Sequence, residues 1–461
     1  MRVIKQILLI TLIVASLSSC GVAIRRCQEP KLNLPQEIVE GELDSLSIAD
    51  MSWWEFYGDE VLSGFIAHAL ENNKDILVAA TRVQQLHELN RVSRADLLPK
   101  LGATIMADNE SENYTSKGHT ETAQFDLKVD LSWEIDLWGN LHWSKRKAKA
   151  EYLAGVEAER AMRITVIAEV ASAYYQLRAL ENELLIVKRT LQTRSEGVEL
   201  ARLRYEGGLT SETVYQQAKV EYATTASLIP AIETKIEATK NSLNVLLGEN
   251  PSIELEYSRM KVLDREIPTS LPIGLSSSLI ARRPDIRESE QKLKAATAAV
   301  GVAYTARFPK LVVGLTGGWE NGELANFFSA PYGLLVGKLA APLFEFGRRK
   351  AKYEAAVQAY DIARLNYEKR VLVAFKETND ALTLYRNARK ATELKNTLRE
   401  AALKYVELAT VQYKYGDIKY INVLDAQRRY FDAQIGLSNA VRDEYLALVQ
   451  LYKSLGGGWN E

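Results

Sequence analysis

The sequence predicts a mainly α-helical chain built from two similar halves, each with one very long helical hairpin and one pair of β-strands. Three observations support this fold class. Motifs recur at an offset of 208 to 210 residues, two long stretches contain no proline, and a segment before the first stretch alternates strictly between apolar and polar residues. A repeat at a fixed offset is the signature of a duplicated structural unit.

The internal repeat divides the mature chain. The matching positions have an offset of 210 at first and of 208 later: Asn73 to Ile76 with Arg283 to Ile286, Pro99 with Pro309, Gly139 with Gly347, Gly208 with Gly416, and Gly248 with Gly456. The net change in length lies between Pro99 and Gly139, and surface loops tolerate such changes. We expect these parts: a first repeat over residues 59–270, with strands in about 101–137 and a turn near residue 208, and a second over residues 271–461, with strands in about 311–345 and a turn near residue 416.

Each repeat is expected to hold a helix of moderate length and then, after a β segment, a very long one. The moderate helices span Lys74 to Leu98 and Pro284 to Phe308. A proline follows each of them, and the residue before a proline resists the α conformation. The long stretches run from Asn140 to Glu206 and from Arg348 to Tyr415. At 1.5 Å per residue, each would be a rod roughly 100 Å long.

Glycines mark the far ends of the two rods. Gly207 and Gly208 follow the first rod and Gly416 follows the second, as left-handed C-caps do. Thr210 and Ser211 are candidate N-caps of a returning helix. The rods alone are also typical of an ordinary coiled coil, and the β segments distinguish the two interpretations.

The strongest strand signal lies in residues 125–137. Apolar side chains occupy one face there and polar side chains the other: Phe125, Leu127, Val129, Leu131, Trp133, Ile135 and Leu137 against Asp126, Lys128, Asp130, Ser132, Glu134 and Asp136. Such a strand separates water from a core or from lipid, and its length suffices to cross a membrane. Trp133 and Trp138 are candidates for an aromatic girdle at the membrane surface.

Three further strands are expected at about residues 101–108, 311–320 and 332–344, with the polar link Asn109 to Thr120 as an external loop. Four strands cannot close a barrel, and open strand edges are not viable in lipid. Three chains would supply twelve strands, which can enclose an open lumen.

The N-terminus has the features of a secretory signal peptide of the lipoprotein type. Basic residues precede an apolar run, and Leu17-Ser18-Ser19 lead into Cys20. We expect residues 1–19 to be the signal peptide, Cys20 to be lipidated, and residues 20–58 to form an anchored linker. No Asp follows Cys20, which indicates the outer membrane of a Gram-negative bacterium. The alternative is an ordinary signal peptide with an incidental cysteine.

Composition argues against several classes of function. The chain has 58 basic and 59 acidic residues, so its charge does not favour a nucleic-acid partner. The four histidines are scattered, and there is no zinc-protease motif, phosphate loop or nucleophile elbow. We therefore expect no enzyme activity, no metal and no cofactor. Cys27 is the only other cysteine, so we interpret it as an incidental linker residue.

Several motifs resemble one known family. They are Trp53 to Asp59, Ser242 to Gly248, Arg282 to Glu290 and Val423 to Gln427, together with Pro230, which interrupts the first returning helix. The chain is similar in these motifs, and over essentially all of its mature length, to the outer-membrane factor (TolC-type) family, in its lipoprotein branch (OprM- or NodT-like). Within Arg282 to Glu290, Pro284 suits a first helical turn and Asp285 the positive helix start, so we interpret both as structural.

The resemblance implies a homotrimer with a twelve-stranded β-barrel in the outer membrane and an α-helical barrel that forms a tunnel across the periplasm. It implies a passive exit duct for small molecules such as drugs and toxic compounds. An inner-membrane pump, expected to be of the RND type, would drive export through a periplasmic adaptor protein. The alternatives are a type I protein-secretion duct and a lipid-tethered periplasmic coiled-coil scaffold or adaptor.

The resemblance also implies where a gate and a partner contact would lie. Asp425 matches the acid that rings the narrow entrance in the family, and three copies would form a carboxylate ring that favours cations. The alternative for Asp425 is a solvated position on a helix face. The family's second acid is replaced by Asn422 and a basic residue by Ile418, so the substitute latch candidates are Tyr413, Lys419 and Glu212. The candidate adaptor-contact residues are Gly207, Gly208, Leu209, Thr210, Ser211, Gly416 and Asp417.

Overall fold

The computed structural model describes Cys27, Pro30 and residues 51–114, 118–251, 282–341 and 343–457, except the side chains of residues 112–121. The expected signal peptide and the lipidated Cys20 lie outside these residues, as does most of the expected linker. The chain forms two compact units. The sheet unit comprises the described residues within Met1–Leu32, Thr81–Glu157 and Arg287–Arg370, and the hairpin unit those within Asn33–Ala80, Ala158–Ile286 and Val371–Glu461.

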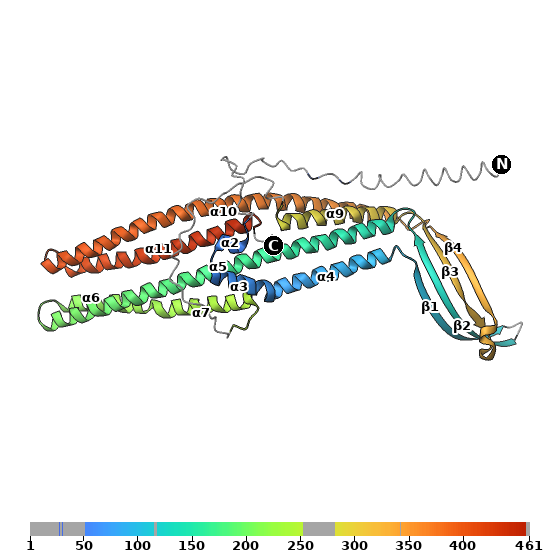
Figure 1. The fold of residues 1–461 in the computed structure, drawn as a ribbon, viewed down its shortest axis with the longest axis horizontal. Helices are drawn as coiled ribbons and strands as arrows, with labels where there is room; N and C mark the ends of the chain where they lie inside the picture. Colours follow the sequence, from blue (N-terminus) through green and yellow to red (C-terminus); the bar gives the residue numbers. More distant parts are fainter. Residues whose placement is uncertain are drawn as a thin grey trace. The chain divides into compact units, whose positions relative to one another are not determined.

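The sheet unit holds one antiparallel sheet with the strand order β1-β2-β3-β4 (Figure 1). The strands are β1 (Lys100–Tyr114), β2 (Gly118–Ile135), β3 (Lys310–Asn321) and β4 (Pro331–Ala340), with the short helix η3 (Leu324–Ser329) between β3 and β4. All four expected strands are thus confirmed. The order leaves β1 and β4 as the two edges of the sheet.

One face of the sheet is apolar and exposed. The pairing of the strands places four leucines in one row across it, namely Leu101, Leu131, Leu315 and Leu335. Their exposed fractions are 73%, 38%, 50% and 73%. Soluble proteins rarely leave so large an apolar patch uncovered, so this face is built to contact something other than water.

The expected external loop from Asn109 to Thr120 is wrong in its extent. Strand β1 continues through Tyr114 and β2 begins at Gly118, with Asn109 paired to Ala123. Polar side chains do not stop a ladder, because the hydrogen bonds of a strand pair come from the backbone. The two strands therefore extend into the expected loop from both sides. The fourth strand ends earlier than expected, at Ala340, and a proline at position 342 has no N–H to offer a ladder.

The helices are α2 (Trp53–Tyr57), α3 (Glu60–Asn72), α4 (Lys74–Ala95), α5 (Asn140–Glu206), α6 (Glu212–Ala226), α7 (Leu228–Leu247), α9 (Pro284–Thr305), α10 (Arg348–Tyr415) and α11 (Tyr420–Ser454). The two rods, α5 with 67 residues and α10 with 68, begin and end where the sequence predicts. The moderate helices end three residues early, because a tighter turn precedes each proline: Leu98 N–H bonds to the Ala95 carbonyl and Phe308 N–H to the Thr305 carbonyl. Among the described helices, none combines the length and apolarity needed to span a bilayer.

The backbone confirms the internal repeat. Glycines with positive φ occur in three pairs at an offset of 208: Gly139 with Gly347, Gly208 with Gly416, and Gly248 with Gly456. Glycine enters this left-handed region at little cost. The two repeats therefore make the same three chain reversals.

The first returning helix is broken where its proline predicts. Helix α6 ends at Ala226 and α7 begins at Leu228, whereas α11 in the second repeat is continuous. Pro230 lacks an N–H, and its ring would clash with the carbonyl of Ala226, four residues earlier, in an unbroken helix.

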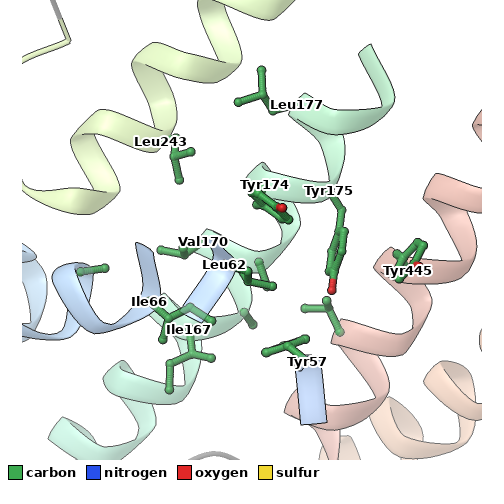
Figure 2. Packing of buried hydrophobic residues seen from close by; sticks show 14 of the residues in the cluster. Tyr57, Leu62, Ile66, Ile167, Val170, Tyr174, Tyr175, Leu177, Leu243 and Tyr445 are labelled. Carbon is green, nitrogen blue, oxygen red and sulfur yellow. The ribbon is translucent and has the colours of Figure 1, made fainter. Parts of the chain in front are cut away.

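The core of the hairpin unit lies where α2, α3, α5, α7 and α11 meet (Figure 2). Tyr175 of α5 stacks on Tyr445 of α11, with ring centroids 4.5 Å apart. Asp59 caps α3 by accepting from the N–H groups of Val61 and Leu62, and it also accepts from the hydroxyl of Tyr174 at 2.9 Å. The core therefore joins elements from the start, the middle and the end of the chain.

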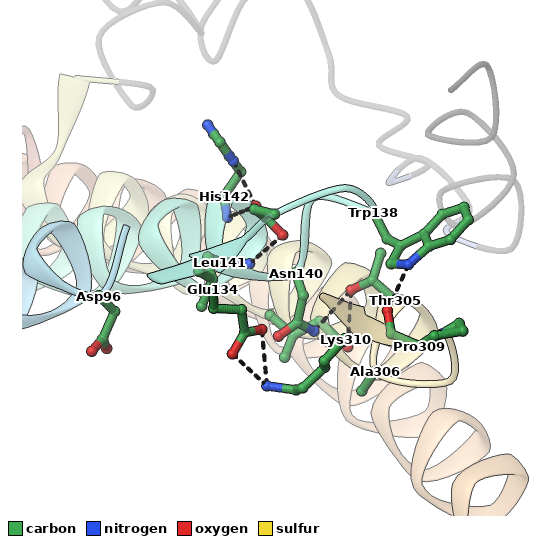
Figure 3. Close-up of polar contacts among 12 residues, drawn as sticks. Asp96, Glu134, Trp138, Asn140, Leu141, His142, Thr305, Ala306, Pro309 and Lys310 are labelled. Carbon is green, nitrogen blue, oxygen red and sulfur yellow. Dashed lines mark hydrogen bonds and ion pairs between the residues drawn. The ribbon is translucent and has the colours of Figure 1, made fainter. Parts of the chain in front are cut away.

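Polar contacts join the two repeats where β2 and β3 meet the helices of the sheet unit (Figure 3). The indole N–H of Trp138 donates to the carbonyl of Pro309 at 2.7 Å. Lys310 and Glu134 form an ion pair at 3.0 Å. Asn140, the first residue of α5, donates to the hydroxyl of Thr305 at 2.9 Å. We call this junction of β2 with β3 the internal seam.

Cys27, which we interpret from the sequence as an incidental linker residue, makes packing contacts in the structure. It is half-buried and packs on a cluster in the sheet unit formed by Leu293, Val300, Tyr353, Val357 and Tyr360. Burial and the nearby Asp361 carboxylate raise the pKa of its thiol. Cys27 therefore behaves as a small packing residue.

Candidate gate and partner-contact site

The ends of the two hairpins are built alike. Gly208 N–H bonds to the carbonyl of Tyr205, and Leu209 N–H to the carbonyl of Arg204. In the second repeat Gly416 and Asp417 make the equivalent bonds to Tyr413 and Gln412. This pair of bonds around a left-handed glycine is the Schellman motif. The expected C-caps at Gly208 and Gly416 are therefore confirmed.

The expected adaptor-contact residues lie at these turns and most are exposed. Leu209 is 73% exposed, and Tyr415, beside the second turn, is 80% exposed. Ser211 occupies the N-cap position of α6, but its side chain makes no capping hydrogen bond. Thr210 is half-buried, and Gly207 and Asp417 are exposed. The turns thus offer apolar side chains to a partner.

A groove of about 600 Å³ runs between α6 and α11 in the hairpin unit. Two of the expected gate residues, Glu212 and Asp425, line it from opposite helices. The other lining residues are Thr213, Gln216, Gln217, Val220, Glu221, Ile421, Leu424 and Arg428. The lining of the groove is therefore mixed, with apolar, polar and charged side chains.

Asp425 is held by two arginines of its own helix. Arg428 and Arg429 each donate to its carboxylate at 2.8 Å. The hydrogen bonds from Arg429 and then Arg428 lower the pKa of Asp425. Each chain thus places one carboxylate and two guanidinium groups here, which the motif Val423 to Gln427 alone does not reveal.

The other latch candidates do not gather at one point. Tyr413 lies under the guanidinium of Arg204, 5.4 Å from its ring centroid, and 5.3 Å from the ring of Tyr420. Lys419 is exposed at the N-cap position of α11, and its carbonyl accepts from the Asn422 N–H. Glu212 accepts a hydrogen bond from Gln216 at 3.3 Å. Only Glu212 and Asp425 share a surface, the groove.

Sequence reasoning missed a buried arginine beside the groove. Arg194 of α5 is only 8% exposed, and it pairs with Glu221 of α6 at 3.0 Å. It also donates to Thr225 and lies 5.5 Å from the ring centroid of Phe431 on α11. Burial lowers the pKa of Arg194, against the charge of Glu221. Arg194 therefore fixes the spacing of α5, α6 and α11.

A second buried arginine, Arg283, lies in the segment interpreted as structural. Helix α9 begins at Pro284 and has Asp285 in its first turn, which confirms that interpretation. Arg283 is 5% exposed and donates to Asp285, to Glu377 and, at 2.8 Å, to the carbonyl of Ser454. Burial opposes its charge, but the two carboxylates outweigh burial and raise its pKa.

The first repeat makes the same joint without a charge. Asn73 matches Arg283 in the repeat, and its amide donates to the carbonyl of Leu246 at 2.8 Å. Leu246 matches Ser454 at the offset of 208. Among the described residues, no group of three His, Cys, Asp or Glu side chains is arranged to hold a metal.

Helices of nearly seventy residues, joined to a sheet with an exposed apolar face, define a class of protein: the outer-membrane channel proteins. The chain belongs to the outer membrane efflux protein family, whose model matches residues 65–249 and 275–457. It is therefore the outer-membrane component of an efflux pump, as the resemblance in its motifs implies. Members of this family are channels rather than enzymes.

Individual relatives agree over nearly the whole chain. The probable efflux pump outer membrane protein TtgC of Pseudomonas putida is 31% identical over 90% of this chain and 87% of its own length. The probable outer membrane lipoprotein SilC of Salmonella typhimurium is 29% identical over 96% of this chain and 97% of its own. The solved outer-membrane channel OprN has a TM-score of 0.85 and 26% identity over 94% of this chain and 99% of that one.

Proposed function

We propose that three copies of this chain form one efflux duct, with four strands from each copy closing a twelve-stranded barrel. The observation that supports this proposal is the order of the described sheet, which leaves the outer edge of β1 and the outer edge of β4 unpaired beside an exposed apolar face. Unpaired strand edges are not viable in lipid, so the sheet has to be completed by other copies. The duct carries small molecules such as drugs and toxic compounds outward and catalyses no reaction.

The proposed partners are a periplasmic adaptor and an inner-membrane pump of the RND type. The adaptor contacts the hairpin ends at Gly207 to Ser211 and at Gly416 to Asp417. The exposed Leu209 and Tyr415 support this assignment, because exposed apolar side chains at a helix turn favour protein contact. The proposed domain boundaries remain residues 59–270 and 271–461, with lipidation at Cys20.

The mass of the purified protein tests the trimer. Light scattering in detergent is expected to give about three times the mass of the chain, because only several copies can complete the sheet. A stable monomer would contradict the shared barrel. The same preparation should form conducting channels in planar bilayers.

The proposed gate charge at Asp425 can be tested by selectivity. Asp425→Asn leaves Arg428 and Arg429 without their carboxylate, so the ratio of cation to anion conductance should fall. The matched control replaces both arginines with glutamine and keeps Asp425, and cation preference should then rise. If neither variant changes selectivity in planar bilayers, Asp425 lies on an ordinary solvated helix face.

The acid response of this site follows from the lowered pKa of Asp425. Because the pKa of Asp425 is lowered, its ion pairs with Arg428 and Arg429 are complete above the usual aspartate pKa of about 3.9 and are lost as pH falls below that value. Cation preference should therefore stay constant from about pH 8 to pH 5. A change within that window would have to come from another group.

A further inference from the structure

The two strand pairs of the chain have the same register over the positions that both contain. Lys100 pairs with Ser132 in the first repeat, and Lys310 pairs with Ala340 in the second. An offset of 210 carries β1 onto β3, and an offset of 208 carries β2 onto β4. These are the offsets of the sequence repeat on either side of its change in length.

The internal seam therefore indicates how β4 would pair with β1, a pairing that the two edge strands of one chain cannot make with each other. It pairs the second strand of one repeat with the first strand of the next, for example Leu131 with Leu315. The equivalent junction joins β4, a second strand, to β1, a first strand. In the described sheet these are the two edges.

We propose that β4 pairs with β1 of another copy in the register of the internal seam, through a contact with fewer side-chain hydrogen bonds than that seam has. Applying the two offsets to Leu131 and Leu315 places Leu339 opposite Ile105. This inference rests on the proposed shared barrel and adds the register and the chemistry of its subunit contact.

The side chains at these positions are apolar and uncovered in the single chain. Ile105 is 83% exposed and Leu339 is 64% exposed. The difference in exposure between the internal seam and its counterpart is clearest just beyond the ends of the strands. In the internal seam Trp138 stacks on Phe308, with ring centroids 4.9 Å apart and both rings half-buried. Their counterparts Phe346 and Leu98 are 91% and 63% exposed, as expected of a pair that meets only between copies.

The polar contacts of the internal seam are mostly absent from its counterpart. The internal seam has Gln124 with Glu320, Asp130 with Thr316, Glu134 with Lys310, and Trp138 with the Pro309 carbonyl. At the subunit contact, the positions equivalent to Asp130 and Thr316 are occupied by Lys338 and Met106, which cannot form that hydrogen bond. The position equivalent to Glu134 is a proline, and the position equivalent to Trp138 is Phe346, whose side chain has no N–H donor. The subunit contact thus relies more on the backbone ladder than the internal seam does.

Cysteine cross-linking of the full-length protein tests the register. In a Cys27→Ser background, Leu339→Cys with Ile105→Cys should give disulfide-linked dimers and trimers under a mild oxidant, because directly opposite residues lie within disulfide reach. The matched control is Leu131→Cys with Leu315→Cys, which should give the same bond inside one chain. Pairing Leu339→Cys with Leu101→Cys or with Asn109→Cys shifts the partners by four residues, roughly 13 Å, which is too far for a disulfide.

The outcomes separate this inference from the proposed function. A trimer that cross-links at a shifted pair, or that does not cross-link at Leu339 and Ile105 while the internal control does, overturns the register and leaves the duct intact. A monomer by light scattering overturns both.

A second variant tests the chemistry of the contact. Lys338→Asp with Met106→Thr transplants the hydrogen bond of Asp130 and Thr316 into the subunit contact. The double variant should dissociate from trimer to monomer at a higher temperature than the wild type and than either single variant, as seen by unheated and heated gel electrophoresis. A double variant no more stable than the single variants contradicts the proposed opposition of these two residues.

Discussion

At the scale of the residue, buried arginines fix how several helices of the hairpin unit pack together. Arg194 and Arg283 each join three helices through one guanidinium group. A planar group with five donors suits this task, because it can bond to several acceptors in different directions at once. Removing such a group leaves the carboxylates that it neutralises without their countercharge.

Arg283→Met should therefore lower the stability of the protein. We expect a loss of about 3 kcal/mol, at the lower end of the range for broken buried ion pairs, since the Glu377 side chain is 39% exposed. The readout is the temperature of helix unfolding by circular dichroism in detergent. Asn73→Ala, at the uncharged joint of the first repeat, is the control and should cost only about 1 kcal/mol. Equal losses would show that the charge adds nothing.

The sequence predicts single residues less well than it predicts elements. It marks Glu212 and Asp425 as functional, and the structure brings both to one groove. It does not reveal that Arg428 and Arg429 hold Asp425, because basic residues three and four positions along a helix are common on solvated faces. Arg194 was missed for a related reason: its burial depends on α6 and α11, which lie far from it in sequence.

At the scale of the element, the left-handed glycines fix where each helix stops. Gly208 and Gly248 have the same backbone conformation, with φ of 72° and 78°. Their surroundings differ. A β-carbon at Gly208 would meet nothing within 4 Å, whereas one at Gly248 would lie 2.3 Å from the carbonyl oxygen of Asn72.

Alanine at these two glycines should therefore have unequal effects. Gly208→Ala should cost about 1–2 kcal/mol, the strain of a left-handed residue with a side chain. Gly248→Ala should lower the stability by a larger amount, because the Asn72 backbone would also have to move. Thermal unfolding of both variants measures the difference. If Gly208→Ala proved the more damaging, the turn would have contacts that the single chain does not show.

The elements themselves are largely predictable. Periodicity, proline and glycine locate both rods to the residue, because these signals act locally. The outer part of the first strand pair was misassigned as a loop, since residues 109–114 carry polar side chains and backbone pairing leaves no trace in composition. Pairing with β2 decided their conformation.

At the scale of the whole molecule, the exposed leucine row of the sheet implies that lipid is a permanent partner. The lipid anchor proposed at Cys20 is then an addition to this attachment and not its only source. Acyl chains contribute roughly 0.8 kcal/mol for each buried CH2, whereas the row exposes leucines on all four strands.

Cys20→Ser should therefore yield a protein that still requires detergent and still has the mass of about three chains, because the apolar face of the sheet needs lipid whatever the anchor. Membrane fractionation and light scattering of the exported variant test this expectation. A variant that becomes soluble and monomeric without detergent would favour a lipid-tethered scaffold over a duct.

The identical register of the two strand pairs has an evolutionary consequence. The segment from Pro99 to Gly139 is two residues longer than its counterpart from Pro309 to Gly347, and the whole difference falls beyond the paired positions Lys100 with Ser132 and Lys310 with Ala340. The change in length is thus confined to the ends of the strand pairs that lie away from the helices. Insertions and deletions at those ends can accumulate over generations without altering the register of the remaining ladder.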